Sequence, residues 1–422
     1  MEYAIGVALF ALGILVSISL HEAGHLGTAK IFRMKATRYF VGFGPTLWSF
    51  RRGETEYGIK GIPLGGFVKI VGMTPQDDDV APEDRHRAMW RFPVWKRTVV
   101  MGAGSAVHFL LGFAILWGVF AFAPINDFDR LPQAPAQVSQ VAECTALAWE
   151  VDATTGAERA CVPGEDPASA AGRAGLRSGD IITEVDGRAV TGWGEFTDRI
   201  RAAGGTTVTL TYLRDGETRQ SSANLPLAER IRQDSDATTA DEVTADDLER
   251  VGVLGVTPVI PRTVHGPVAG AGLAADQTGL MFRATAEALG RLPERVPQLW
   301  QAVFGGERHP ETPMSVVGAS RIGGELWERG ELPTWLVFLA AVNFFVGIFN
   351  LLPLLPLDGG HIAISWFERA RSWAYTRLGK PDPGRVNYYK MMPVTYVVIM
   401  IMGGFFLLTI AADIVNPVRL PF

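Results

Sequence analysis

Residues 3–25 of the chain read YAIGVALFALGILVSISLHEAGH. The first 18 of them, residues 3–20, contain no Asp, Glu, Lys or Arg, and a helix of this length crosses a hydrocarbon core of roughly 30 Å. A secretory signal peptide has a basic region at its start and an Ala-x-Ala cleavage pattern at its end, and this segment has neither. We therefore expect a retained membrane-spanning helix that runs directly into a cluster of polar residues.

Three further stretches are equally free of charge, and they cover residues 98–123, 334–357 and 391–412. The alternative is a set of buried helices in a large soluble core, but four uncharged runs of 18 to 26 residues favour membrane spans. The composition agrees, since 48% of the 422 residues are hydrophobic and the mean hydropathy is +0.15. The expected fold class is a polytopic α-helical membrane protein with four transmembrane helices and additional soluble parts.

The composition also argues against other classes of function. The formal net charge of -5 is spread along the chain, so we expect no concentrated basic surface and no nucleic-acid partner. The two cysteines, Cys144 and Cys161, are too few for a disulfide framework and form no Cys-x-x-Cys pair. Any zinc ion must therefore find other ligands.

The basic residues predict the orientation in the membrane. Thirteen Lys and Arg residues lie between the first and second uncharged stretches and six between the third and fourth, whereas the amino-terminal flank has none and the carboxy-terminal flank only Arg419. Loops rich in Lys and Arg remain in the cytoplasm. We therefore expect both termini and the long segment 124–333 on the opposite, extracytoplasmic side.

The first basic loop contains a β pattern. Residues 41–48 and 55–69 alternate small or polar residues with aromatic and β-branched residues between glycines, which predicts a short antiparallel β element. Bare sheet edges cannot face lipid, so such an element near the membrane must pack on protein or line a wet cavity.

The polar cluster after the first span has the spacing of a metal site. On a helix, His21 and His25 lie on one face one turn apart, so both imidazoles can reach the same ion. Glu22 lies beside them, where it can accept a proton from an attacking water. Polar groups next to hydrocarbon are costly and persist mainly at functional sites. The alternative is a pair of histidines that cap the helix end at the membrane interface.

A catalytic zinc ion needs a third protein ligand and one open position. Asp358 follows the third uncharged stretch, in the sequence NLLPLLPLDGGH at residues 350–361. The first and third spans run in the same direction, so His21 and Asp358 are predicted at the same depth. Pro353 and Pro356 break a helix and leave non-helical backbone, which at membrane depth must be buried or face a cavity and can hold an extended substrate.

The predicted outer region shows a pattern of strands and turns over residues 137–227. Within it, residues 174–190 read AGLRSGDIITEVDGRAV, a Gly turn followed by a β-branched strand and a second turn. A helix is expected at residues 195–202 and a strand at 206–214. This order of elements resembles a PDZ domain of the bacterial periplasmic type, and the alternative is a generic small β domain.

The PDZ resemblance implies a site for peptides. It places Ala174, Gly175 and Leu176 near a groove that accepts an extended peptide by strand addition. Cys144 and Cys161 lie inside the same outward-facing region, where oxidation is permitted, so a disulfide between them is expected, with two free buried thiols as the alternative.

The remaining segments complete the expected domain organisation. Residues 229–250 are polar and acidic and predict a linker, and residues 280–304 have the pattern of an amphipathic helix in the membrane interface. The expected segments are a first helix with the His-Glu-x-x-His motif at 1–33, a membrane-associated β loop at 34–97, a second helix at 98–123, a PDZ-like domain at 124–228, a linker with the interfacial helix at 229–333, a third helix at 334–357, a cytoplasmic loop at 358–390 and a fourth helix at 391–415.

The motifs taken together resemble the site-2 protease family, and the resemblance covers nearly the whole chain. They are His-Glu-x-x-His at residues 21–25, Pro-Leu-Gly-Gly at residues 63–66, a PDZ-like insertion after the second span, and Asn350-x-x-Pro353 followed by Asp358-Gly-Gly. The single PDZ-like insertion is similar to the actinobacterial form of the family.

This resemblance assigns roles to the motif residues. It implies that His21, His25 and Asp358 bind Zn²⁺, that Glu22 is the general base, and that Asn350 contacts an unwound substrate. Further candidates for binding the substrate are Pro353, Gly65 and Gly66.

The resemblance also implies the reaction and its setting. The expected function is hydrolysis of peptide bonds in or near the transmembrane segment of single-spanning membrane proteins, such as anti-sigma factors or remnant signal peptides, in the inner membrane of a bacterium. The PDZ-like domain is expected to select substrates by size or by a newly exposed carboxy terminus.

Two positions depart from the family pattern. The second proline normally follows the first by two residues, whereas Pro353 and Pro356 are three apart. In the second span a Gly-Pro-x-x-Asn pattern is expected, but the chain has Gly104-Ser-Ala-Val-His108. His108 either replaces an Asn that helps to position substrate or water, or is a lone histidine satisfied by a neighbouring carbonyl, and we favour the second interpretation.

Three rival functions remain at this stage. The first is a non-catalytic membrane adaptor that binds partners through the PDZ-like domain, against which the intact Glu22 argues. The second is an ion transporter, a class that usually shows internal repeats. The third is another membrane zinc peptidase, whose third ligand would lie on a polar helix and not at Asp358.

Overall fold

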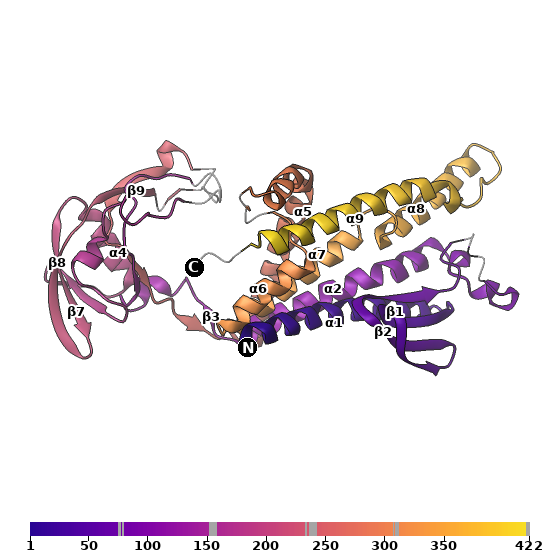
Figure 1. The fold of residues 1–422 in the computed structure, drawn as a ribbon, viewed down its shortest axis with the longest axis horizontal. Coiled ribbons are helices and arrows are strands. Elements are labelled where there is room, and N and C mark those ends of the chain that lie inside the picture. The colour runs from indigo at the N-terminus through magenta and orange to yellow at the C-terminus, as the bar shows by residue number, and fades with distance from the viewer. Residues whose placement is uncertain are drawn as a thin grey trace. The chain divides into compact units, whose positions relative to one another are not determined.

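The computed structural model describes residues 1–74, 77, 80–151, 158–232, 234–235, 243–306, 308 and 312–418. The chain forms two compact units (Figure 1). One unit combines Met1–Ala123 with His265–Phe422, and the other is Pro124–Val264. Each unit is described by itself below.

The first unit is built on membrane-length helices. Among the described residues, four helices are long and apolar enough to cross a membrane, in agreement with the predicted polytopic membrane protein. Three of them are α1 (Glu2–Ile31), α2 (Val94–Phe122) and α7 (Leu332–Asn350), and the fourth is α9 (Met392–Val415) with the 3-10 turn η6 (Tyr388–Met391) before it. Figure 1 shows these four helices running roughly parallel to one another.

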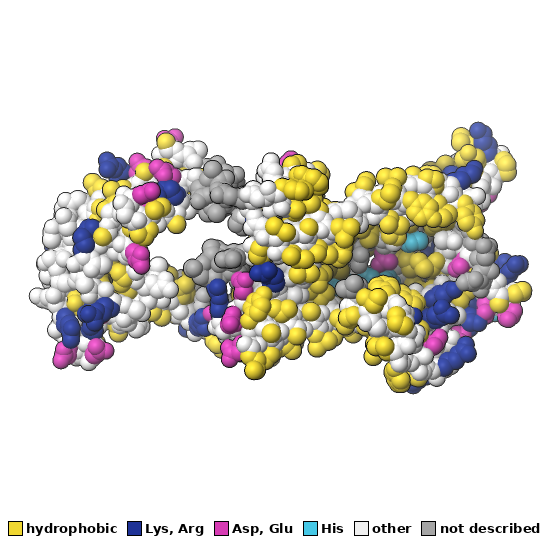
Figure 2. Space-filling model, viewed as in Figure 1, with side chains coloured by type: hydrophobic (Ala, Val, Ile, Leu, Met, Phe, Trp, Pro, Cys, Tyr) yellow, Lys and Arg dark blue, Asp and Glu magenta, His cyan; other side chains and the backbone are white. Residues whose placement is uncertain are grey.

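Large hydrophobic side chains are exposed on the surface of these helices, as expected for helices that face lipid. Leu110 is 69% exposed, and Met400 and Leu407 are each 67% exposed, although a soluble protein rarely exposes large contiguous apolar surfaces. Figure 2 shows hydrophobic side chains over much of the visible surface of this unit. Inside, α2 packs against α1, α5 (Gly266–Val303), α7 and α8 (Asp358–Arg377).

The third span is shorter than predicted. Helix α7 ends at Asn350, and residues 351–357, with Pro353 and Pro356, are not helical. A proline lacks the backbone N–H that a helix needs, so the helix ends before the first of the two prolines and the span does not reach residue 357. The Leu355–Pro356 peptide bond is cis.

The segment predicted as a cytoplasmic loop at 358–390 is largely helical. Helix α8 covers Asp358–Arg377 and buries Gly359, Gly360 and Ile364. The sequence interpretation weighted the basic residues of this segment and missed its apolar face, which packs on α2.

The segment 229–333 contains more helix than the sequence indicated. The amphipathic helix expected at 280–304 is the second half of α5, which has 38 residues. A further helix, α6 (Val316–Glu328), was not predicted, and the side chain of Ser315 caps its start by accepting hydrogen bonds from the N–H groups of Val317 and Gly318. Helix α6 packs against α1.

The predicted β element is an antiparallel hairpin. Its strands are β1 (Ala36–Arg52) and β2 (Thr55–Ile70), longer than the pattern indicated and with several register shifts. Strand β2 packs against α1, so one edge of the hairpin lies on protein, as a β element near a membrane requires. The 3-10 turns η1 (Pro82–Arg87) and η2 (Met89–Arg91) lead from the hairpin to α2.

The second unit contains a four-stranded antiparallel sheet. Its order is β6 (Arg188–Ala189), β5 (Ile181–Val185), β7 (Thr207–Arg214), β8 (Glu217–Asn224). Helices α3 (Ala170–Arg173) and α4 (Trp193–Ala202) accompany the sheet, and Phe196 and Leu210 are among the residues of its core. The strands and helix expected from residue 181 to residue 214 are therefore present.

This unit extends beyond the predicted boundary at residue 228. The chain returns to it in three strand pairs, which join β9 (Leu227–Ile231) to β10 (Leu248–Gly252), β11 (Val256–Pro258) to β4 (Val138–Val141), and β12 (Arg262–Thr263) to β3 (Ile125–Asn126). The 3-10 turns η3 (Leu131–Gln133) and η5 (Ala245–Asp247) complete it. Because β3 and β4 precede the sheet in sequence, the end of the unit at Val264 depends on long-range pairing that the acidic composition of the segment concealed. Part of the predicted linker, residues 233 and 236–242, lies outside the described residues.

Cys144 and Cys161 are joined in a disulfide with an S–S distance of 2.00 Å. The bond closes a loop across a sequence separation of 17 residues. The two free thiols considered as the alternative are not what the structure contains.

Candidate metal centre

The predicted ligands come together from two helices that are far apart in sequence. His21 and His25 lie one turn apart on α1 and are 6% and 4% exposed, and Asp358 is the first residue of α8. The Nε2 atoms of the histidines are 3.0 Å apart, and Oδ2 of Asp358 lies 3.3 Å from Nε2 of His21 and 3.2 Å from Nε2 of His25. All three ligand atoms thus face one point, as the sequence predicted.

The atoms of this cluster suit a zinc ion. Among the described residues, none donates a hydrogen bond to the buried Oδ2 of Asp358, although two imidazole nitrogens lie within 3.3 Å of it. A buried carboxylate oxygen without a partner is costly, and a cation shared with the two nitrogens removes that cost. Two imidazole nitrogens and one carboxylate oxygen are also a common ligand set of catalytic zinc, with one position left for water.

Helix α2 leaves space for this cluster through Gly104. A Cβ atom at this position would lie 2.5 Å from Nε2 of both His21 and His25, closer than real Cβ atoms approach. Gly24, inside the His-Glu-x-x-His motif, has the matching role on α1, since a Cβ there would lie 2.8 Å from the carbonyl oxygen of Ala103. The two glycines therefore allow α1 and α2 to meet closely at the ligands.

The orientation of His25 is set by the backbone of α2. Its Nδ1 lies 2.7 Å from the carbonyl oxygen of Val100. A carbonyl only accepts, so Nδ1 carries the proton and the lone pair of Nε2 points into the cluster. Ligand histidines usually have such an outer partner, which holds the tautomer and the ring in place.

Glu22, the predicted base, lies where α1 meets strand β2. It is half-buried, and a Cβ on Gly66 would lie 3.4 Å from its Cγ and 3.0 Å from the carbonyl oxygen of Phe40. The neighbouring Gly65 has a φ of 145° and lies against the ring of Phe43. The two glycines predicted to contact substrate are therefore placed next to the predicted general base.

The residues predicted to contact substrate from the third span are at its end. Asn350 is the last residue of α7 and is half-buried, and Pro353 is exposed in the non-helical segment that follows. Within the described part of the chain, the Asn350 side chain makes no hydrogen bond, so its amide is available to a ligand.

His108 has the carbonyl partner that our favoured interpretation gave it, but this carbonyl belongs to a side chain and a predicted zinc ligand lies next to the ring. It lies on α2, is 1% exposed, and its Nδ1 is 2.9 Å from the side-chain oxygen of Asn343 on α7. Its ring centre is 5.0 Å from that of His21. Its partner is thus a side-chain amide and its neighbour a predicted zinc ligand. The sequence interpretation did not single out Asn343, although an Asn within an uncharged span is itself a signal of function.

In the second unit, Ala174, Gly175 and Leu176 form the turn after α3. Gly175 has a φ of 75°, and the Leu176 side chain is buried in the core. The backbone N–H groups of all three residues donate to carbonyl oxygens of residues 170–172. These donors are therefore used within the turn, and a peptide beside it would need others.

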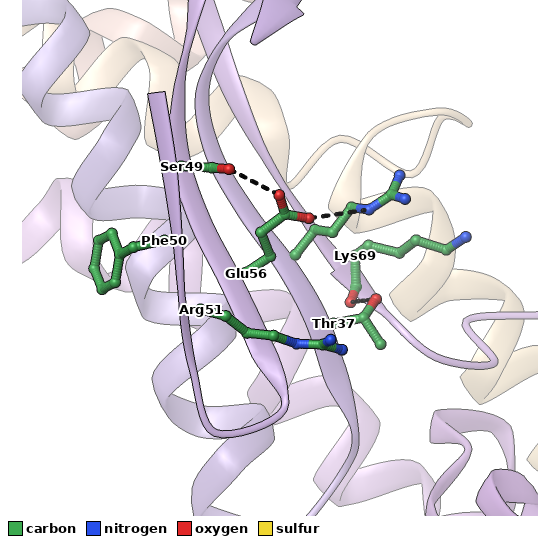
Figure 3. Close-up of a pocket in the computed structure, with 7 residues that line it drawn as sticks. Thr37, Ser49, Phe50, Arg51, Glu56 and Lys69 are labelled. Carbon is green, nitrogen blue, oxygen red and sulfur yellow. Dashed lines mark hydrogen bonds and ion pairs between the residues drawn. The ribbon is translucent and has the colours of Figure 1, made fainter. Parts of the chain in front are cut away.

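A pocket of about 560 Å³ lies elsewhere, on the hairpin (Figure 3). Its lining includes Arg38, Arg51 and Glu56, and Glu56 accepts a hydrogen bond of 3.0 Å from Ser49. Neither the two histidines nor Asp358 lines it, so this pocket does not mark the metal centre. Figure 2 instead shows His and acidic side chains together in a hollow of the helical unit.

Comparison with known proteins identifies the family. The sequence profile described as Peptidase family M50 matches residues 9–380. The chain belongs to peptidase family M50. This confirms the resemblance to site-2 proteases that the motifs suggested.

Similar proteins from other organisms agree with this assignment. The chain is 40% identical over 424 residues to "Zinc metalloprotease Rip1" of Mycolicibacterium smegmatis, and the match covers all of both proteins. It is 39% identical over 420 residues to the protein of the same name from Mycobacterium tuberculosis, again over all of both. It is 26% identical to "Regulator of sigma-E protease RseP" of Escherichia coli, with 94% of this chain and 95% of the relative covered.

These comparisons bear out the predicted enzyme class. A zinc-dependent peptidase of the site-2 protease family is what the sequence indicated, and the names of the M50 relatives agree in both activity and metal. They do not support the non-catalytic adaptor or the transporter.

Proposed function

We propose that this M50 protein cleaves single-spanning membrane proteins in or next to their transmembrane segment, with His21, His25 and Asp358 as the zinc ligands and Glu22 as the general base. The observation that carries this proposal is the approach of Oδ2 of Asp358 to within 3.3 Å of Nε2 of both histidines.

The chemistry follows from these side chains. Zinc bound by His21, His25 and Asp358 would supply a Lewis acid for the scissile carbonyl and would make the attacking water easier to deprotonate. Glu22 is next to a ligand on the same helix and lies under strand β2, so its carboxylate can accept a proton from the water and deliver it to the leaving amine. Hydrolysis requires water at the buried ligands. We propose that water reaches them through the hollow in which His and acidic side chains lie together.

Substrate binding is proposed at the non-helical backbone around the site. A transmembrane helix shields its own carbonyl groups, so a substrate must unwind before it is attacked. We assign the extended segment to the space bounded by Gly65 and Gly66 of β2, by Asn350 and by Pro353. Support comes from the contact of Gly66 with Glu22 and from the unused amide of Asn350.

The membrane orientation and the role of the second unit are part of the same proposal. The distribution of Lys and Arg supports a cytoplasmic hairpin and a cytoplasmic α8, with both termini and Pro124–Val264 outside the inner membrane. We propose that the second unit is PDZ-like and selects substrates beside the turn at 174–176. Anti-sigma factors are the favoured substrates, since one relative is named a regulator of sigma-E, and remnant signal peptides are the second class.

The proposal is tested by measuring bound zinc and cleavage on the same preparations. The purified full chain should contain stoichiometric zinc and cleave a synthetic transmembrane peptide in detergent. Asp358→Ala should lose both the zinc and the cleavage. Glu22→Gln should keep the zinc and lose the cleavage, because it removes the base and leaves the ligands.

Two results would contradict the assignment. Wild-type zinc content in Asp358→Ala would remove that residue from the ligand set. Full peptide cleavage by Glu22→Gln would remove Glu22 as the base.

A further inference from the structure

Two buried side chains next to the metal centre form a pair that the proposed reaction does not use. His108 on α2 and Asn343 on α7 are each 1% exposed, and Nδ1 of His108 lies 2.9 Å from Oδ1 of Asn343. Polar groups at this depth of a membrane helix are expensive. Their presence therefore calls for a function.

The hydrogen bonds determine which nitrogen of His108 is protonated. The amide nitrogen of Asn343 donates to the carbonyl oxygen of Leu339 at 2.8 Å, which turns Oδ1 towards His108. An amide oxygen only accepts, so Nδ1 of His108 is the donor. The neutral ring then presents Nε2 as a bare acceptor, and this buried atom has no hydrogen-bond partner in the described part of the chain.

The neighbouring ring has the complementary need. His21 directs Nε2 towards Asp358 and His25, so a His21 that binds zinc through Nε2 carries its proton on Nδ1. That atom is also buried, and none of the residues that the structure describes is its hydrogen-bond partner. The corresponding nitrogen of His25 has the carbonyl of Val100 on α2 as its partner, whereas no described residue fills that role for Nδ1 of His21.

The two rings are close enough to satisfy each other. The ring centres of His21 and His108 are 5.0 Å apart. His21 and His25, with ring centres 4.7 Å apart, already place two nitrogens 3.0 Å from each other. A separation of 5.0 Å between the ring centres is therefore compatible with a hydrogen bond between one nitrogen of each ring.

Helix α2 explains why the position faces His21. Gly104 and His108 are four residues apart and so share one face of the helix. Gly104 leaves the space next to Nε2 of His21 and His25, and one turn later His108 fills the space next to the ring of His21 with an acceptor.

We propose that His108 is a positioning residue for the zinc ligand His21, whose Nδ1–H it accepts through Nε2, and that Asn343 holds His108 in the tautomer this requires. This inference rests on the proposed role of His21 as a ligand. It gives His21 the outer hydrogen bond that metal-binding histidines usually have.

The alternative partner for Nε2 of His108 is a water molecule that donates a hydrogen bond to it. A cavity of about 10 Å³ adjoins His108 and Asn343 and includes Ser17 in its lining, which is about the volume one buried water requires. If such a water and not His21 were the partner of Nε2, removal of the His108 acceptor would leave the binding of zinc unchanged.

The test is the zinc affinity of the purified full chain, measured by competition with a chromogenic chelator. His108→Phe keeps a planar ring and removes the acceptor, and it should weaken zinc binding about 10- to 100-fold, the usual effect of losing an outer hydrogen bond. His108→Gln can supply an amide oxygen and should restore most of the affinity. The control Ser17→Ala, one turn from His21, should not alter it.

A spectroscopic readout and a double variant separate positioning from general disruption. In the cobalt-substituted protein, His108→Phe should shift the visible absorption bands of the metal, because the ligand ring is reoriented. Asn343→Leu should weaken zinc binding in the same direction, and the double variant His108→Phe, Asn343→Leu should lose little more than His108→Phe alone, because the two residues act through one hydrogen bond. If His108→Phe folds poorly, the zinc affinities of His108→Gln and Asn343→Leu still test the proposal: near-normal affinity in the first and weakened affinity in the second are expected, and unchanged affinity in Asn343→Leu would overturn it.

The outcomes are distinguishable from those of the proposed function. Unchanged zinc affinity and unchanged cobalt bands in His108→Phe, with zinc lost in His21→Ala, would overturn this inference and leave the metal centre intact. Additive losses in the double variant would also overturn it. Zinc retained in His21→Ala would instead overturn the ligand assignment itself.

Discussion

Gly104→Ala should strongly weaken zinc binding and cleavage although it replaces no ligand residue. The added Cβ would lie 2.5 Å from Nε2 of His21 and of His25. An ordinary contact begins at 3.4 Å, so the rings or α2 must shift by about 0.9 Å. Zinc tolerates ligand displacements of only roughly 0.2 Å, and a misplacement of about 1 Å costs on the order of 100-fold in rate. We therefore expect at least about a 100-fold loss in both zinc affinity and cleavage.

The chain provides a matched control for this substitution. Gly102 lies on the same helix, and a Cβ at that position meets no atom within 4 Å. Gly102→Ala carries the same gain in helix propensity and should keep wild-type zinc content and activity. Both variants are compared by metal analysis and by cleavage of the synthetic transmembrane peptide. A fully active, zinc-loaded Gly104→Ala protein would refute the packing argument for the metal centre.

Three further predictions concern stability, and each is checked by unfolding of the full chain. Cys144→Ser removes the disulfide that closes a loop across a sequence separation of 17 residues. It should lower the free energy of unfolding of the second unit by about 3 kcal/mol. An unchanged melting temperature under oxidising conditions would argue against a stabilising disulfide. Glu368→Ala leaves the guanidinium of Arg97, which is 3.2 Å away and equally buried, without this partner. The substitution should lower the free energy of unfolding by about 3–5 kcal/mol, and Glu368→Gln should lower it less. Equal melting temperatures of both variants and the wild type would contradict this prediction. Burial acts to raise the pKa of Asp180, but the hydrogen bonds from Arg214 and the Arg177 backbone outweigh it and hold the pKa below its usual range. The contribution of Asp180 to stability is therefore complete above the usual Asp pKa and is lost as the pH falls through the depressed pKa. Asp180→Asn should therefore reduce the loss in melting temperature of the second unit between neutral and acidic pH. The same loss in the variant and the wild type would refute this prediction.

The sequence alone determined those features of this protein that depend on neighbours in the chain. Four uncharged stretches predict membrane helices because length and polarity decide whether a segment can lie in hydrocarbon. His21 and His25 share a face because four residues make about one helical turn. The hairpin at β1 and β2 and the sheet strands near residues 181–214 follow in the same way from alternation and turn residues.

The tertiary structure alone decided how these local elements meet. Asp358 was proposed as the third ligand from its depth, but its approach to the histidines depends on α7 ending at Asn350 and α8 beginning immediately after the proline segment. The space that Gly104 leaves for the two histidines depends on how closely α2 approaches α1. The hydrogen bond between His108 and Asn343 joins side chains that are 235 residues apart in the sequence. Periodicity reports only which face of an element is apolar, whereas these contacts are set by close packing between elements, so they became visible only when the helices were assembled.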